Sequence, residues 1–302
     1  RNEKDKEWNG QDLNGKRLMC YSDQAGGDLI QFVRYLKLAK DAGAIIIVET
    51  GQELISILQS IPFIDEVVSN KTTDNYDYQV ACTSLPFKFK NYNKFPTSIP
   101  YIFPKILDKH SKVMEIIESC PRLKVGITWA GSVYHGNDHN RSCKLIEFLP
   151  IIKLPNIQLF SFQIGVYANR LESRMTRFLP FRGKINLIEG AEGFFKRNHI
   201  INLDEHLVDF NDTAAYLSKM DLLITVDTAI AHLAGAMNIK TFMGVPFNSD
   251  WRWGLTTNTT DWYPNMTIFR QKSIGRWQNV VQDMKNSINK IKAQARNFLE
   301  LK

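Results

Sequence analysis

The chain has 302 residues, of which 44% are hydrophobic and 23% are charged, and its formal net charge is +7. These fractions are typical of globular proteins and argue against a disordered, collagenous or coiled-coil chain, and the length predicts two domains. The longest aliphatic run is Ile45–Val48, far short of the roughly 20 apolar residues of a membrane helix, so we expect no transmembrane segment.

Cysteine spacing and the first residues bear on location. The cysteines are Cys20, Cys82, Cys120 and Cys143, and none forms a Cys-x-x-Cys pair. This spacing argues against a disulfide scaffold and favours a reducing, cytoplasmic location. The charged segment 1–7 lacks the apolar core of a signal peptide, so we expect the sequence to begin inside a longer product.

Strands alternate with helices in the first half of the chain, as in parallel α/β units. Expected strands cover residues 18–21, 44–49, 65–69 and 78–81, and expected helices cover 29–42 and 52–59. Residues 85–104 contain four prolines and no helical or strand period, which predicts a long loop lining a cleft. A helix over 112–119 precedes Pro121, and we place a domain boundary between residues 122 and 123, so that 1–122 form the first domain.

A second α/β series follows and is predicted to form a domain over residues 123–276. Its expected strands are 124–129, 157–162, 221–226, 240–243 and 267–269, and its expected helices are 212–219 and 228–237, with an irregular stretch over 163–197. The terminal helix from 277 is long enough to return to the first domain. Its lysines and Arg296 are interpreted as a solvated face, so we expect no nucleic-acid partner.

The segment around Asp227 and Thr228 predicts an anion site. It places a polar turn between a buried strand and a helix rich in small residues that opens near Ala229. Free N–H groups of the first helical turn and the helix dipole would bind a pyrophosphate, and His232 returns to the same helix face. An ordinary capped helix and a buried core histidine remain the alternatives.

A second polar turn, over residues 128–132, is followed by cationic side chains. Gly131 and Ser132 can offer backbone amides and a hydroxyl to a phosphate or sugar, and Arg141 and Lys144 can supply positive charge. The alternative is a zinc site formed by His135, His139 and Cys143.

Two further segments have open interpretations. The turn over 23–28 lacks Gly-x-Gly-x-x-Gly, and Asp28 is either a helix cap or a cleft carboxylate, with Gly26 and Gly27 leaving room for an acceptor. Aromatic residues alternate with Arg and Asp around Asp250 and Trp251, which fits either core packing or a wall on which a base or sugar stacks.

Together these segments resemble a bacterial glycosyltransferase-like module that is related to the heptosyltransferase family and is often found C-terminal to tetratricopeptide repeats. The resemblance rests on GGDLIQFVRYLKLAKDAGA, VGITWAGSVYHGNDHNRSCKL, VDFNDTAAYLSKMDLLITVDTAIAHLAGAM and DWRWG followed by WYPNMTIFRQ. It implies the α/β GT-B fold, in which two Rossmann-like domains face each other across a cleft. It also implies inverting, metal-independent transfer of a hexose or heptose from a nucleotide diphosphate sugar, with no cofactor.

Site residues carried over from the resemblance are Asp28 as general base and Thr228, Ala229 and His232 as the diphosphate motif. The full expected donor-binding set is Gly27, Gln31, Trp129, Gly131, Ser132, Arg141, Lys144, Gln163, Asp227, Thr228, Ala229, His232, Asp250 and Trp251. The family usually has Gly-Leu-Gly-Asp where this chain has Ala-Gly-Gly-Asp at 25–28. The acceptor, whether saccharide, lipid-linked or protein, stays open, and a catalytically silent nucleotide-sugar binding or scaffold module is the alternative function.

Overall fold

The structure is a computed structural model that describes residues 4–69, 75–90, 95–105, 112–165 and 190–300. The chain divides into two compact units, and neither is a single stretch of sequence. The first comprises residues 1–111, 207–218 and 229–239, and the second comprises 112–206, 219–228 and 240–302. Within the described ranges, no helix combines the length and apolar character needed to cross a bilayer.

The first unit contains a four-stranded parallel sheet with the strand order β3-β2-β1-β4. The strands are β1 (Arg17–Tyr21), β2 (Ile45–Thr50), β3 (Glu66–Ser69) and β4 (Tyr78–Ala81). The register pairs Cys20 of β1 with Val48 of β2 and Val80 of β4. Strand β2 is buried almost throughout, as its run of isoleucines predicts for a central parallel strand.

The helices of the first unit are short. They are α1 (Gly26–Phe32), α2 (Leu36–Asp41), α3 (Gln52–Leu58), α4 (Leu85–Lys88), α9 (Phe210–Leu217) and α10 (Ala229–Ala236), with 3-10 turns η1 (Lys4–Lys6), η2 (Val33–Tyr35) and η3 (Cys82–Ser84). The expected helix over 29–42 therefore begins earlier and is interrupted by η2. The expected loop over 85–104 opens with α4, because Pro86 lies in its first turn, where a missing N–H costs nothing.

A buried arginine holds the next segment in place. Arg34 is 1% exposed, and its Nη2 donates to the carbonyl of Thr97 at 2.9 Å. Its guanidinium also lies over the rings of Phe95 and Tyr101, at 4.3 and 5.0 Å from their centroids. The Tyr101 hydroxyl donates to the carbonyl of Ile30 in α1 at 2.9 Å. Cation–π contacts and hydrogen bonds thus fix an otherwise irregular segment on the first unit.

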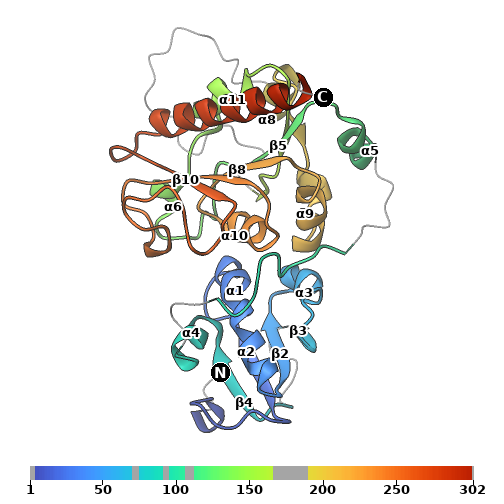
Figure 1. Cartoon of the computed structure of the whole chain (residues 1–302), viewed down its shortest axis with the longest axis vertical. Helices are drawn as coiled ribbons and strands as arrows, with labels where there is room; N and C mark the ends of the chain where they lie inside the picture. Colours follow the sequence, from blue (N-terminus) through green and yellow to red (C-terminus); the bar gives the residue numbers. More distant parts are fainter. Residues whose placement is uncertain (1–3, 70–74, 91–94, 106–111, 166–189, 301–302) are drawn as a thin grey trace. The chain divides into compact units, whose positions relative to one another are not determined.

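The second unit contains a six-stranded parallel sheet with the order β10-β9-β8-β5-β6-β7. Figure 1 labels β5, β8 and β10 of this sheet. Its strands are β5 (Leu123–Ile127), β6 (Ile157–Ser161), β7 (Ile201–Asn202), β8 (Leu222–Val226), β9 (Thr241–Val245) and β10 (Met266–Arg270). Its helices are α5 (Lys112–Ser119), α6 (Asp138–Arg141), α7 (Leu149–Ile152), α8 (Gly190–Arg197) and α11 (Gln278–Glu300), with 3-10 turns η4 (Leu145–Phe148), η6 (Asp204–His206) and η7 (Trp251–Trp253).

Strand order in this sheet follows the doubly wound pattern. The three strands β5, β6 and β7 extend the sheet one way, and β8, β9 and β10 extend it the other way. The order therefore reverses between β5 and β8, and ligands of such sheets bind outside the carboxyl ends of the strands at that reversal. Of the expected irregular stretch over 163–197, residues 190–197 form α8, and 166–189 lie outside the described residues.

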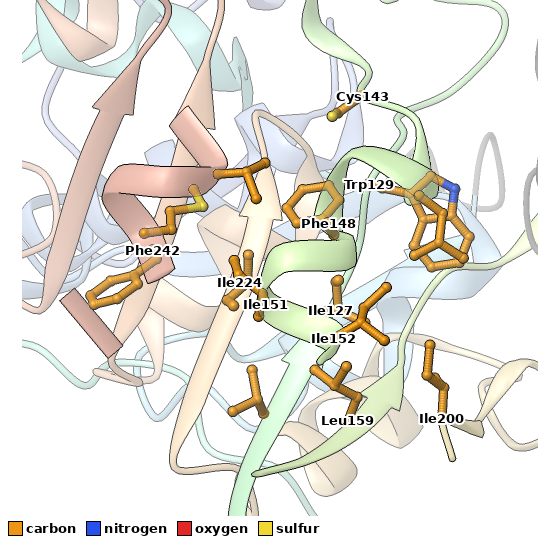
Figure 2. Packing of buried hydrophobic residues seen from close by; sticks show 14 of the residues in the cluster. Ile127, Trp129, Cys143, Phe148, Ile151, Ile152, Leu159, Ile200, Ile224 and Phe242 are labelled. Carbon is orange, nitrogen blue, oxygen red and sulfur yellow. The ribbon is translucent and has the colours of Figure 1, made fainter. Parts of the chain in front are cut away.

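The core of the second unit is one continuous cluster of apolar side chains. Strands β5, β6 and β8 and helix α7 contribute to it, as Figure 2 shows for Ile127, Leu159, Ile224 and Ile151. All five residues of β8 are buried, which is typical of a parallel strand covered on both faces. The cluster extends to Phe148 and Trp129, which follow the strands rather than belonging to them.

Helix α11 belongs to the second unit, although the terminal helix was expected to return to the first domain. Its buried residues Val280, Met284 and Ile288 recur every four positions and join the core of the second unit. Gly244 of β9 makes room for them, since a Cβ there would lie 3.0 Å from the ring of Trp277. The boundary also lies at 111/112 instead of 122/123, because α5 is part of the second unit.

We predict that Met284→Ala destabilises the second unit by about 2–5 kcal/mol, because it leaves a cavity between α11 and the sheet. Met284 is 0% exposed. Urea unfolding followed by tryptophan fluorescence measures the change. Asn289→Ala, at an exposed position of the same helix, is the matched control, and equal midpoints for the two variants would show that α11 does not pack as described.

Candidate functional site

The turn that follows β5 is held by one buried amide. Gln163, which is 3% exposed and follows β6, accepts the N–H groups of Trp129 and Ala130 at 3.1 and 2.9 Å and donates to the Ala130 carbonyl at 3.1 Å. Trp129 is 2% exposed and lies in the core cluster. Both side chains therefore have structural contacts inside the second unit, and their expected donor-binding roles stay predictions.

Arg141 connects this turn to the end of β8. Its Nη1 donates to the carbonyl of Asp227 at 3.1 Å, and a Cβ on Gly131 would lie only 2.6 Å from its Nη2. The guanidinium therefore packs closely against the Gly131 backbone, and a side chain at this position would require the guanidinium to move. Because β5 and β8 flank the reversal of strand order, this cation sits where an α/β sheet binds ligands.

Asp138 and Ser142, which were not among the expected binding residues, make further contacts with Arg141 and Gly131. The amide of Gly131 donates to Ser142 Oγ at 3.0 Å, and that hydroxyl donates to Asp138 Oδ1 at 2.7 Å. Asp138 Oδ1 also lies 3.6 Å from Arg141 Nε. The spacing of Asp138 and Arg141, three residues apart in a short helix, was the available sequence signal.

The remaining residues of the polar loop are more open. Ser132 is exposed, and its hydroxyl accepts the N–H of Tyr134 at 3.3 Å, while Lys144 is half-buried. Among the described residues no group of three His, Cys, Asp or Glu is arranged to hold a metal ion. The alternative zinc site has no such arrangement, since Cys143 is 4% exposed and part of the core, whereas His135 and His139 are exposed.

Asp227 and Thr228 connect β8 to α10. The Thr228 hydroxyl donates to the carbonyl of Val226 at 3.3 Å. Burial raises the pKa of Asp227, and the nearby Asp250 carboxylate raises it further, while Arg141 and Arg252 act in the opposite direction. This carboxylate is therefore less easily ionised than a surface aspartate. The helix α10 begins at Ala229, two residues further along the chain.

The aromatic segment after β9 divides between core and surface. Asp250 Oδ1 accepts both the N–H and the Nη1 of Arg252 at 3.0 Å, so its carboxylate caps η7. Trp251 is 68% exposed and meets Trp262 edge to face at 6.1 Å, whereas Trp253 is 1% exposed. Core packing is thus confirmed for Trp253, whereas stacking of a base or sugar on the exposed Trp251 stays a prediction.

In the first unit, the carboxylates of Asp23 and Asp28, which follow β1, have different hydrogen-bond partners. Asp23 Oδ1 accepts the N–H of Thr83, and Asp23 Oδ2 accepts the Thr83 hydroxyl, which links the loops after β1 and β4. Asp28 is half-buried in the first turn of α1, and its Oδ2 accepts the N–H of Ala25 at 3.2 Å. The helix-cap interpretation of Asp28 is thus present in the structure, with Ala25 rather than Asp28 at the N-cap position.

The glycine and helix residues expected near Asp28 lie in the packed interior of the first unit. A Cβ on Gly27 would lie 3.2 Å from Cα of Ala229 and 3.0 Å from Cδ2 of His232, so this glycine allows α1 and α10 to meet. Gly27 is therefore used for helix packing, and its expected role beside an acceptor stays a prediction. His232 is 6% exposed and Gln31 is 0% exposed, so both side chains are buried in the first unit.

Comparison with known proteins adds one curated relative. Protein FlbA of Caulobacter vibrioides is 24% identical over 297 residues, which cover 90% of this chain and 46% of FlbA. The chain therefore spans about half the length of that relative. No protein-family model matches the chain.

Solved structures define the fold. A family 9 glycosyltransferase from Veillonella parvula matches with a TM-score of 0.58 over 97% of this chain and 100% of that chain, at 13% identity. Escherichia coli ADP-heptose LPS heptosyltransferase II matches with a TM-score of 0.53 over 93% of this chain and 99% of that chain, at 10% identity. This chain has the α/β fold of the family 9 glycosyltransferases and heptosyltransferases.

We predict that the stability of Asp227→Asn relative to the parent rises with pH. A raised folded-state pKa means that the folded chain retains this proton more strongly than the unfolded chain. The resulting stability is complete below the ordinary pKa of an aspartate and is lost as pH rises through the folded-state value. Thermal unfolding should show that the variant-minus-parent difference in midpoint increases from about pH 4 to about pH 7. The increase should be roughly 2–4 °C for each kcal/mol of unfolding free energy that the parent loses relative to the variant. A constant difference would contradict the raised pKa.

Proposed function

We propose that this chain is a glycosyltransferase that moves a sugar from a nucleotide diphosphate donor to an acceptor. Its two units would be the two domains of a GT-B enzyme, with the donor bound by the second. The support is a fold shared with family 9 glycosyltransferases along nearly the whole chain. A tetratricopeptide region before residue 1 stays a prediction.

The observation that carries this proposal is the position of Arg141. Its guanidinium joins the turn after β5 to the last residues before α10, at the reversal of strand order. A diphosphate placed there would meet the cation that the Asp227 carbonyl holds in the second unit. This chemistry supports a donor that carries a diphosphate, and ADP-heptose, which the name of one matching structure contains, is the first donor to test.

Metal-independent binding is part of the proposal, because Arg141 and the half-buried Lys144 can neutralise the phosphates without a divalent ion. We expect ADP, GDP or UDP to raise the thermal midpoint equally in Mg²⁺ and in excess EDTA. Saturation to 100 times the Kd would stabilise the chain by about 2.7 kcal/mol. A midpoint shift that disappears with EDTA would contradict metal independence while leaving nucleotide binding in place.

Asp28 is proposed as the general base that removes the acceptor proton in an inverting displacement. Its carboxylate lies at the end of α1 that follows β1, where a base can face the carboxyl edge of the sheet. We expect Asp28→Asn to keep its fold and donor binding, because an amide oxygen can still accept the Ala25 N–H. Transfer should fall roughly 10²-fold or more, as measured by release of nucleotide diphosphate in the presence of acceptor. Transfer at the parent rate would leave Asp28 as a helix cap alone.

A catalytically silent nucleotide-sugar binding module is the second candidate, and the use of Asp28 as a cap favours it. The two candidates differ in one measurement. A silent module binds the donor and releases no sugar with any acceptor or with water, whereas an enzyme releases nucleotide diphosphate in a manner that depends on Asp28.

A further inference from the structure

The buried carboxylate of Asp138 has no part in the proposed reaction. Asp138 is 7% exposed, although the residues on either side of it, Asn137 and His139, are exposed. Carboxylates are rarely buried unless they are paired, because the loss of hydration is costly. Here Ser142 Oγ donates to Asp138 Oδ1 at 2.7 Å, and Arg141 Nε lies 3.6 Å from the same oxygen.

Two contacts of Asp138 lie beside the cation that is proposed to bind the donor phosphates. Through Ser142, whose hydroxyl also accepts the Gly131 N–H at 3.0 Å, Asp138 is tied to the backbone over which the guanidinium lies. Through its own ion pair, Asp138 restrains the inner end of that guanidinium. The opposite edge is restrained by the carbonyl of Asp227 at 3.1 Å.

These restraints leave hydrogen-bonding capacity on Arg141. Within the part of the chain that the structure describes, the guanidinium of Arg141 makes one hydrogen bond, to the Asp227 carbonyl. A guanidinium has five N–H donors in a rigid plane, so donors remain for an incoming anion. Its side chain is 14% exposed, which permits contact at one edge while the orientation stays fixed.

We propose that Asp138 is a positioning residue that presets Arg141 for the diphosphate of a nucleotide donor. This inference rests on the proposed donor site. A long arginine side chain loses rotamer freedom when a ligand immobilises it, and a protein that orders it beforehand avoids that loss on binding. Asp138 holds the guanidinium through their ion pair, and Ser142 links Asp138 to the Gly131 backbone by hydrogen bonds.

Two other roles for Asp138 give different results. If Asp138 only stabilised its short helix, its replacement would lower the unfolding midpoint and leave nucleotide affinity unchanged. If it acted only as a nearby negative charge, its removal would reduce repulsion and tighten binding of an anion. Positioning through Arg141 alone predicts weaker binding that depends on the presence of Arg141.

The experiment measures calorimetric affinities of the full chain for whichever of ADP, GDP and UDP binds most tightly, and for the matching monophosphate. The variants are Asp138→Asn, Ser142→Ala, Arg141→Ala and the double variant Asp138→Asn/Arg141→Ala. His139→Ala, at an exposed neighbouring position of α6, is the matched control. Circular dichroism and thermal midpoints establish the folded fraction of each variant.

We expect Asp138→Asn to weaken the diphosphate up to about tenfold, the scale of ordering one long side chain on binding, with the monophosphate little changed. Ser142→Ala should show the same selectivity with a smaller loss. In the Arg141→Ala background, Asp138→Asn should have no further effect, because its action passes through Arg141. Equal or tighter diphosphate binding by both Asp138→Asn and Ser142→Ala would overturn the positioning role while leaving the proposed function intact. A parent chain that binds none of the three diphosphates would overturn both.

Discussion

The close packing of the Arg141 guanidinium on the Gly131 backbone organises the carboxyl edge of the six-stranded sheet. The neighbouring contacts of Gln163, Ser142 and Asp138 all hold one of these two partners or the backbone beside them. In its present position the guanidinium of Arg141 occupies the space that a side chain at Gly131 would need. The backbone before Gly131 is held by the Gln163 side chain, and the Gly131 N–H is held by the Ser142 hydroxyl. Buried or half-buried polar side chains therefore fix the backbone of this turn.

The same arrangement explains why buried polar groups accumulate beside an apolar core. Gln163, Asp138 and Asp227 are withdrawn from water, and hydrogen bonds or opposite charges partly compensate each of them. Such groups contribute little to net stability, but they fix direction in a region where apolar packing alone is non-specific. The apolar cluster beneath them supplies the stability, as the packing of Phe148, Ile151 and Ile224 illustrates (Figure 2).

Local pattern was enough to predict most strands, because runs such as Ile45–Val48 and Leu222–Val226 have the composition of buried parallel strands. It failed where the outcome depends on distant residues. The two-residue strand β7 exists only through its pairing with β6, and the amphipathic pattern of α11 shows which face is buried without showing what it packs on. Residue type alone also could not separate Gln163, whose side chain hydrogen-bonds inside the fold, from Arg141, which is proposed to bind a ligand.

The discontinuous first unit has a consequence for synthesis. Helices α9 and α10 belong with residues 1–111, yet α9 follows three and α10 follows four of the second unit's six strands along the chain. During translation, therefore, the first unit is complete only after residue 239 has been synthesised. A fragment that stops at residue 122 would lack both helices and leave apolar surface on α1 and α3 uncovered. Dissecting this chain into separately expressed halves calls for circular permutation or co-expression rather than a simple cut.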